Sequence, residues 1–257
     1  MSSSYDVYGL GNALVDTEYE VDDDFLRTHD IAKGHMTLVV AERQQVVIRQ
    51  LADLPPRRGS GGSAANTLIG VSGFGGRAYY SCRVADDDTG RFFVRDLLAA
   101  GVDTNADQHH GGGVSGQCLV MVTPDAERTM NTFLGISSAL SRANVHEDAL
   151  RSARYLYMEG YLCPSDSARE AVIHARGIAR EAGVKVAATL SDPAMVELFA
   201  PQLADMFGDH VDHLFCNEEE ALQWTRTDSL EAAADALKAF ADTFSITRGG
   251  RGCLVWD

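Results

Sequence analysis

In the second half of the chain, short apolar segments alternate with segments whose apolar residues recur at helical spacing. The apolar segments predict strands at 155–159, 184–190, 211–216, 244–247 and 253–256. The segments between them predict helices at 166–182, with a capping box at Ser167 and Glu170, at 195–207, from 218 onward and at 229–242. Strands that alternate with helices in this way form a parallel sheet covered on both faces. The expected fold class is therefore α/β, with a doubly wound, mainly parallel sheet and helices on both faces.

The first half of the chain follows this alternation less regularly. Strands are expected at 5–10 and 78–84, and helices at 41–54, at 64–73 and from a Thr89 cap to Gly101. Two β-rich segments, about 17–40 and 114–133, depart from the alternation, and the second reads as a hairpin with strands at 117–123 and 128–133. We expect these segments to form a small β lid on a single α/β domain that spans residues 1–257.

Several polar residues follow the predicted parallel strands at the point where each strand ends. In open α/β sheets, ligands bind outside the carboxyl ends of the strands, and these ends share one edge. The residues expected at that edge are Gly11, Asn12, Glu159, Gly160, Ser191, Asp192, Asn217 and Thr247.

The glycine-rich stretch 59–67 is the most distinctive local signal. Gly61 and Gly62 precede a run of helix formers, so a flexible turn is expected to lead into a helix whose free N–H groups face a ligand. Asn66 falls in the first helical turn, where its carboxamide offers a donor and an acceptor. No Gly-Lys-Ser/Thr follows, which excludes a Walker-type phosphate loop. An ordinary loop-to-helix junction is the alternative.

The amino-acid composition limits the classes of molecule that the protein is expected to bind. With 37 acidic and 22 basic residues, the formal net charge is −15, which argues against nucleic acid or an anionic membrane as a partner. No signal peptide or membrane-spanning segment is expected, and the five scattered cysteines are typical of a reduced, cytoplasmic protein. The adjacent His109 and His110 read as loop residues rather than as a metal site.

A dinucleotide-binding function is a further alternative, because Gly9-Leu10-Gly11 resembles the start of a dinucleotide fingerprint. Leu14 occupies the position where the fingerprint has glycine or alanine, and an acidic stretch follows instead of a helix. The pattern therefore favours other functions.

Taken together, three ordered motifs resemble those of the ribokinase-like, phosphofructokinase-B type of carbohydrate and nucleoside kinases. The motifs are Gly61-Gly62-x-x-x-Asn66, Asn217-x-x-Glu220 and Thr247-x-Gly249-x-x-Gly252. The adenosine-kinase branch is the most similar, through Gly11-Asn12-x-Leu14-x-Asp16, Val21-Asp22-x-x-Phe25-Leu26, Leu190-Ser191-x-Pro193 and Leu214-Phe215-x-Asn217-Glu218-x-Glu220-Ala221. The resemblance implies transfer of a phosphoryl group from ATP to a primary hydroxyl of a nucleoside, adenosine-like, or of a furanose sugar.

The resemblance also implies roles for particular residues. Asp16 would accept hydrogen bonds from sugar hydroxyls, and the same pocket would include Asn12, Gly61, Gly62, Asn66 and Phe133. Arg128 would stabilise charge on the phosphates or the substrate. Thr247, Gly249 and Gly252 would line the ATP site. Asn217 and Glu220 would position Mg²⁺, with Glu220 contacting the metal through water. Each of these residues could instead have a purely structural role. The alternatives are a turn residue for Asp16, a helix cap for Asn217 and a first-turn acid for Glu220. The resemblance leaves undecided whether the protein depends on a monovalent cation and whether it forms a homodimer through the lid.

One motif of the family is absent from this sequence. The family has a Gly-Ala-Gly-Asp signature whose N–H groups form an anion hole and whose aspartate is the catalytic base, and no stretch of the 257 residues matches it. We therefore expect this chain to be part of a longer kinase and to be inactive on its own. The alternative is a non-catalytic nucleoside- or sugar-binding protein derived from the kinase fold.

Overall fold

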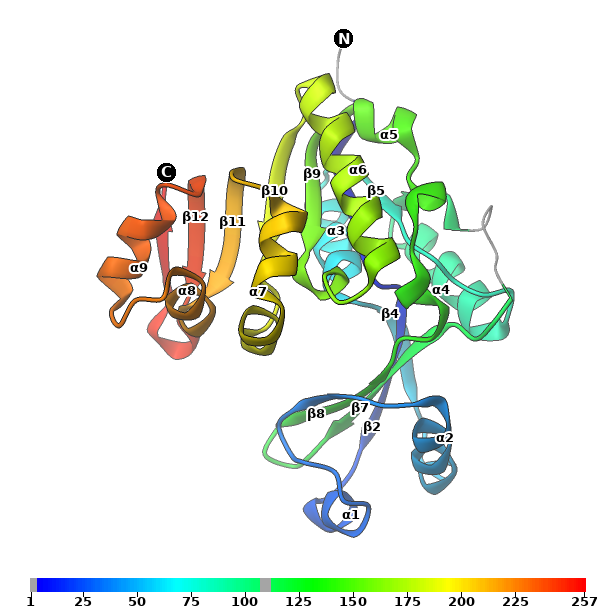
Figure 1. Ribbon diagram of the computed structural model, residues 1–257. Helices are drawn as coiled ribbons and strands as arrows, with labels where there is room; N and C mark the ends of the chain where they lie inside the picture. Colours follow the sequence, from blue (N-terminus) through cyan, green and yellow to red (C-terminus); the bar gives the residue numbers. More distant parts are fainter. Residues whose placement is uncertain (1–3, 107–111) are drawn as a thin grey trace.

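The computed structural model describes residues 4–106 and 112–257, so the predicted loop histidines His109 and His110 lie outside the described residues. Its main body is built on an eight-stranded sheet with the strand order β13-β12-β11-β10-β9-β1-β5-β6 (Figure 1). The strands are β1 (Tyr5–Leu10), β5 (Ala78–Ser81), β6 (Val102–Thr104), β9 (Ala153–Glu159), β10 (Lys185–Thr189), β11 (Val211–Asn217), β12 (Ala241–Thr247) and β13 (Cys253–Trp256). All neighbouring pairs are parallel except β12–β13. The predicted α/β class with a mainly parallel sheet is confirmed.

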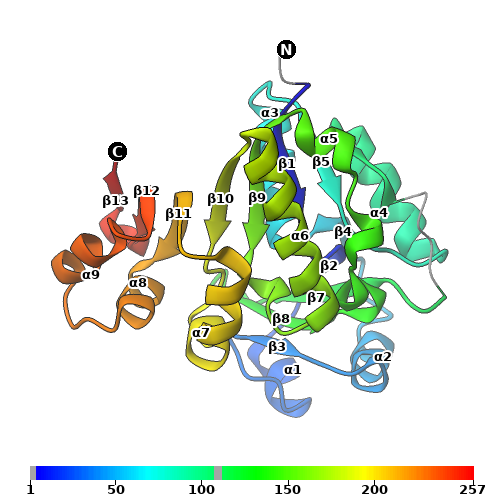
Figure 2. The same cartoon turned by 45° about the horizontal axis from the view of Figure 1, so that its top comes forward.

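Helices pack on both faces of this sheet, and strands β1, β5, β9 and β10 alternate their side chains between two hydrophobic cores. The larger core joins inward residues such as Leu156, Leu214 and Phe244 to the helices on one face, and a second core joins Tyr80 and Leu68 on the other. The first face carries α5 (Glu147–Arg151), α6 (Asp166–Ala182), α7 (Pro193–Phe207), α8 (Glu218–Thr225) and α9 (Leu230–Leu237); the second carries α3 (Ser63–Gly73) and α4 (Asp88–Ala99) (Figure 2).

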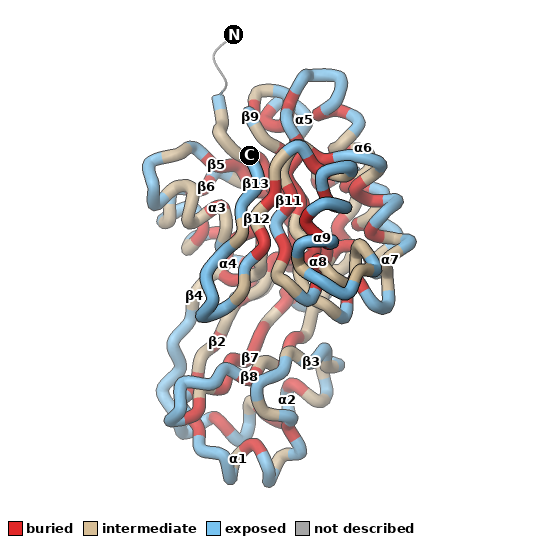
Figure 3. The backbone as a smooth tube through the Cα atoms, turned by 90° about the vertical axis from the view of Figure 1, so that its left-hand side faces the viewer, coloured by how far each residue is buried: buried red, intermediate tan, exposed pale blue. Residues whose placement is uncertain are grey.

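A second, five-stranded sheet projects from the main body, and we call it the small sheet (Figures 1 and 3). Its order is β3-β8-β7-β2-β4, with β2 (Leu14–Glu20), β3 (Met36–Leu38), β4 (Arg57–Gly61), β7 (Gly116–Val122) and β8 (Arg128–Phe133). Two helices, α1 (Asp23–Thr28) and α2 (Ala41–Gln50), accompany it and share a core with β2 and β7. The predicted hairpin is confirmed as the antiparallel pair β7–β8.

Some local predictions were wrong. The glycine-rich stretch that was expected to be a turn forms strand β4 as far as Gly61, which sequence reasoning missed because glycine carries no side chain to show a period of two. The cap of α4 is Asp87 rather than Thr89, and the cap of α6 is Ser165 rather than Ser167, since these side chains accept the bonds from Gly90 N and Ala168 N. Helix α2 ends at Gln50, several residues before the expected stop.

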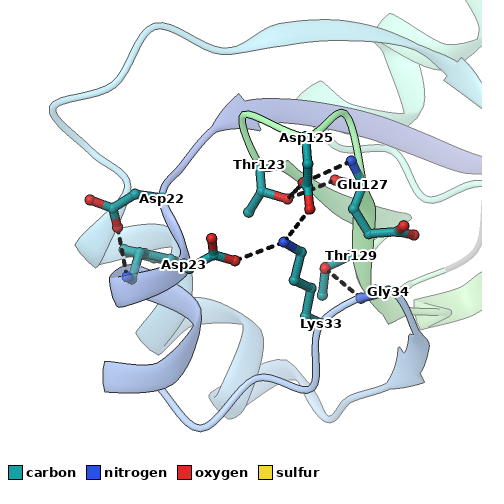
Figure 4. A network of polar contacts seen from close by, with 9 residues as sticks. Asp22, Asp23, Lys33, Gly34, Thr123, Asp125, Glu127 and Thr129 are labelled. Carbon is teal, nitrogen blue, oxygen red and sulfur yellow. Dashed lines mark hydrogen bonds and ion pairs between the residues drawn. The ribbon is translucent and has the colours of Figure 1, made fainter.

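A polar network fixes the outer tip of the small sheet (Figure 4). The Lys33 ammonium bridges Asp23 of α1, at 2.8 Å, and Asp125 of the β7–β8 turn, at 2.7 Å. Asp125 also accepts a hydrogen bond from Thr123 Oγ1, and these contacts hold the pKa of its carboxyl well below the usual value. The network therefore ties α1 to the hairpin that carries Arg128.

Short 3-10 segments complete the described structure: η2 (Gly135–Ala139), η3 (Arg142–Asn144), η4 (Gly160–Leu162) and η5 (Gly249–Arg251). Among the described residues, no helix combines the length and apolar character needed to cross a bilayer.

Candidate functional site

The carboxyl ends of the parallel strands meet at the edge of the main sheet that borders the small sheet. The strand register places Leu10 beside Met158, Thr189 beside Glu159, and Asn217 beside Thr247. The residues predicted to gather at one edge therefore do so, and they form two neighbouring groups, one around Asn12 and Glu159 and one around Asn217 and Thr247.

Glu159 is the centre of the first group. It ends β9, its side chain is 1% exposed, and its two carboxylate oxygens accept hydrogen bonds from Asn12 N and Ala64 N, each at 2.7 Å. Burial raises the pKa of the Glu159 carboxyl to about 7, against the opposing effect of these two N–H donors. One side chain thus joins the β1–β2 loop to the start of α3. Sequence reasoning placed Glu159 at the edge but gave it no role; an acid that ends an apolar strand was the available signal.

Asn12 is buried and held from several sides. Its side-chain amide lies 3.4 Å from the Tyr161 carbonyl oxygen, and its Oδ1 lies 3.5 Å from Ser137 Oγ. Asn66 lies about one turn along α3 from Gly62 and is exposed, with its backbone N–H bonded to Gly62 O. The residue is therefore accessible to a ligand from solvent.

Gly62 caps α3 in a conformation that favours glycine. Its φ is +100°, and a Cβ added there would lie 2.3 Å from Asn12 O. The close approach of these two backbones brings the first turn of α3 against the Asn12 loop, so the glycine is required by both backbone conformation and space.

Substitution of Gly62 tests this requirement. Gly62→Ala is expected to lower the free energy of unfolding by roughly 2 kcal/mol or more, because the new Cβ must displace the Asn12 backbone and the positive φ is strained for alanine. Thermal and urea denaturation measure the change. Gly59→Ala is the matched control, since its Cβ would meet no atom within 4 Å and its effect should be small.

Asp16 lies on β2 between two neighbours, Gly59 of β4 and Cys118 of β7. A Cβ on Gly61 would lie 2.2 Å from Asp16 Oδ1, so Gly61 provides the space that the carboxylate occupies. Burial raises the pKa of Asp16 to about 6; the positive charge of Arg128 opposes this shift and the negative charge of Glu18 adds to it. The structure thus brings Asp16, Gly61 and Gly62 together, with Arg128 within electrostatic range.

Phe133 ends β8, opposite Gln117 of β7, and is half-buried. It therefore lies at the same end of the small sheet as Asp16, on the side nearer to the main body.

Asn217 and Glu220 form a closed capping box at the start of α8. Asn217 N and Nδ2 donate to the two Glu220 oxygens at 3.0 and 2.7 Å, and Asn217 Oδ1 accepts from Glu220 N at 2.8 Å. Glu220 is 4% exposed, and burial raises the pKa of its carboxyl, with Asp192 adding to the shift. This geometry explains Asn217-x-x-Glu220 as a helix cap. The remaining lone pairs of the Glu220 carboxylate can still accept a hydrogen bond from a metal-bound water.

The fit of these side chains to Mg²⁺ depends on their oxygen donors. Within residues 4–106 and 112–257, no group of three or more histidine, cysteine, aspartate or glutamate side chains could enclose a metal. Glu220 and Asp192, which interact electrostatically, nevertheless offer carboxylate oxygens at the same edge. This donor set fits a Mg²⁺ that keeps its water and is carried by phosphates, the usual arrangement for this ion.

Beside the capping box, the β12–β13 turn leaves open space. Thr247 is exposed at the end of β12, and Gly249 and Gly252 have positive φ angles of 56° and 87°. A Cβ on either glycine would meet no atom within 4 Å, so both backbones face unfilled space. Arg251 and Arg248 pair with Glu218 and hold this turn against α8.

Known proteins share this fold. The structure of a probable sugar kinase from Rhizobium etli CFN 42 superposes with a TM-score of 0.90 at 33% identity, covering 99% of this chain and 77% of that one. Adenosine kinase from Sinorhizobium meliloti superposes with a TM-score of 0.89 at 35% identity, covering 98% of this chain and 77% of that one.

Sequence comparison agrees with the structural one. Guanosine-inosine kinase from Escherichia coli (strain K12) is 24% identical over 97% of this chain, which spans 59% of that relative's length. Residues 54–257 match the pfkB family of carbohydrate kinases. The chain belongs to the pfkB carbohydrate kinase family.

Proposed function

We propose that this chain carries the substrate and nucleotide sites of an ATP-dependent kinase that phosphorylates a primary hydroxyl of a nucleoside or a furanose sugar. The observation that carries the proposal is the Asp16 carboxylate, which is half-buried against Gly61 and borders the glycine-capped start of α3. A buried carboxylate forms strong hydrogen bonds to sugar hydroxyls and discriminates against analogues that lack them.

A nucleoside is the favoured substrate class. The relatives named above as adenosine kinase and guanosine-inosine kinase support a purine nucleoside, whereas the probable sugar kinase supports a free sugar. In either case Asn12 and Asn66 would complete the polar contacts to the sugar, and Phe133 would provide an apolar surface.

The second group of residues would hold ATP. Thr247, Gly249 and Gly252 border open space at the end of β12, where a nucleotide can approach the backbone. Asn217 and Glu220 would orient Mg²⁺ through water, and the ion would neutralise charge on the phosphates. A monovalent cation is compatible with this arrangement.

The small sheet would act as a lid. Arg128 lies on β8, and its charge already acts on Asp16, so closure of the small sheet would bring a cation toward substrate and phosphates. A homodimer through the outer surface of this sheet, where Leu38 is 54% exposed, is part of the proposal.

A binding protein without phosphoryl transfer is the second candidate. These 257 residues contain no match to Gly-Ala-Gly-Asp, and phosphoryl transfer needs a base for the attacked hydroxyl. We propose that the 257-residue chain binds the substrate without turning it over.

Calorimetric titration with adenosine, guanosine, inosine, ribose and fructose, paired with an ATP-turnover assay, tests these proposals. Saturable binding of one of these compounds without turnover supports the proposal for this chain. Turnover would contradict the expected inactivity, and lack of binding by all five compounds would contradict the substrate site.

A further inference from the structure

Helix α4 of the main body lies beside the place where β2, β4 and β7 enter the small sheet (Figures 1 and 2). Its side chains make specific contacts with β4 and β7, the two strands that flank β2. These contacts connect the main body to the strands on either side of the one that carries Asp16.

The first contact is with the edge of the small sheet. Strand β4 is an edge strand, so N–H groups on its outer side have no strand partner. Ser60 N donates to Asp96 Oδ2 at 2.7 Å, and Ser60 Oγ donates to Phe93 O at 3.2 Å. Asp96 thus provides the acceptor that this edge would otherwise lack.

The second contact is with β7. Thr89 Oγ1 accepts a hydrogen bond from Gln117 Nε2 at 2.7 Å. Two residues earlier in the chain, Ser115 donates to both oxygens of Asp87, through its N at 2.8 Å and its Oγ at 2.7 Å. Helix α4 and its N-cap Asp87 therefore hold the start of β7 at two points, Ser115 just before the strand and Gln117 within it.

The strand register shows that these contacts involve residues that lie side by side on neighbouring strands, which we call a row. Ser60 and Gln117 are both paired with Val15 of β2, one on each side. The next row contains Gly59, Asp16 and Cys118, about 3.3 Å further along the strands. The row that α4 contacts on both sides of β2 is therefore adjacent to the row that contains the Asp16 carboxylate.

We propose that Asp96 and Thr89 are positioning residues for the substrate carboxylate Asp16, with α4 as the fixed support on which the small sheet is mounted. The proposal rests on the proposed function for the role of Asp16. When the support is intact, β4 stays paired with β2 and Gly61 stays over Asp16. When it is removed, the edge strand separates and water reaches the carboxylate.

The experiment measures the titration of the Asp16 carboxyl by carbon-detected NMR in the 257-residue chain. In Asp96→Ala we expect the midpoint to move from the wild-type value toward the ordinary aspartate value, by about one pH unit or more, because hydration removes the cause of the raised pKa. Asp96→Asn retains an acceptor oxygen for Ser60 N and should restore most of the wild-type midpoint.

Asp88→Ala is the matched control, because this acid lies on the same helix with its side chain 97% exposed and pairs with Arg91 rather than with the small sheet. Its Asp16 midpoint should equal that of the wild type. If Asp96→Ala does not fold, Thr89→Val tests the other end of the row by removing the acceptor for Gln117. An Asp16 midpoint that does not move in the folded variant overturns the proposal.

A binding measurement separates this proposal from the proposed function. Calorimetry with adenosine should show a dissociation constant raised roughly tenfold in Asp96→Ala, the size expected when one hydrogen-bonding group is misplaced. If Asp16→Ala binds adenosine as the wild type does, the proposed function fails, while the titration still decides whether α4 positions Asp16.

Discussion

Asp16→Ala is expected to raise the dissociation constant of the nucleoside or sugar by on the order of 100-fold, the loss expected for charge-assisted hydrogen bonds from a buried carboxylate. The carboxylate faces Gly61 so closely that no larger residue fits opposite it. Alanine would leave the ligand hydroxyls without their charged acceptor. Isothermal titration calorimetry measures the change directly.

Glu18→Ala is the control for this experiment. Glu18 lies two residues further along β2, so its side chain is on the same side of the strand, and it pairs weakly with Arg57 at 3.8 Å. Its removal alters the local charge without removing the proposed acceptor. Equal affinities for Asp16→Ala and the wild type would contradict the assignment of Asp16 to the substrate site.

The raised pKa of Asp16 adds a pH dependence to the same binding reaction. With a pKa of about 6, Asp16 is ionised above that pH and becomes protonated below it. Since a protonated carboxyl accepts fewer hydrogen bonds, we expect the affinity for the nucleoside or sugar to fall as the pH decreases through about 6. Asp16→Ala should lack this component, which calorimetry at pH 5 and pH 8 would show.

The sequence was sufficient for the fold class and for the edge at which the site lies. Both follow from long-range regularities: the alternation in the second half indicates a parallel sheet, and parallel strands place Asn12, Asn217 and Thr247 at one edge. The hairpin β7–β8 was also predictable, because two β-rich runs flank a turn that contains Pro124. These features depend on local patterns that are repeated along the chain.

Features that depend on contacts between distant segments could not be predicted in this way. Strand β4 is rich in glycine and arginine and has no apolar alternation, so its pairing with β2 is decided by tertiary contacts. The link from Glu159 to Asn12 spans 147 positions of sequence, and no local pattern indicates that it forms. The same is true of the contact between Ser60 and Asp96.

At pH 8, where Glu159 is ionised, Glu159→Gln is expected to destabilise the protein by roughly 2–4 kcal/mol, because two buried N–H donors depend on this one carboxylate. Asn12 N and Ala64 N each bond a different oxygen, whereas glutamine has one oxygen and an NH₂ group that would face the second donor. Urea denaturation measures the free energy of unfolding. Glu181→Gln is the control: Glu181 lies on α6 with its side chain 70% exposed, and its effect should be within about 0.5 kcal/mol.

The same substitution should have a larger effect at pH 5 than at pH 8. The pKa of Glu159 is raised from 4.5 to about 7 in the folded protein, so between these values the folded state holds a proton that the unfolded state releases. The stabilisation from this proton is complete below 4.5 and is lost as the pH rises through about 7, by up to about 3 kcal/mol. Glu159→Gln cannot bind the proton, and other titrating groups, including Asp16, cancel in the comparison with the wild type. A destabilisation that is equal at both pH values would show that Glu159 is ionised throughout this range, with its two N–H bonds outweighing the effect of burial.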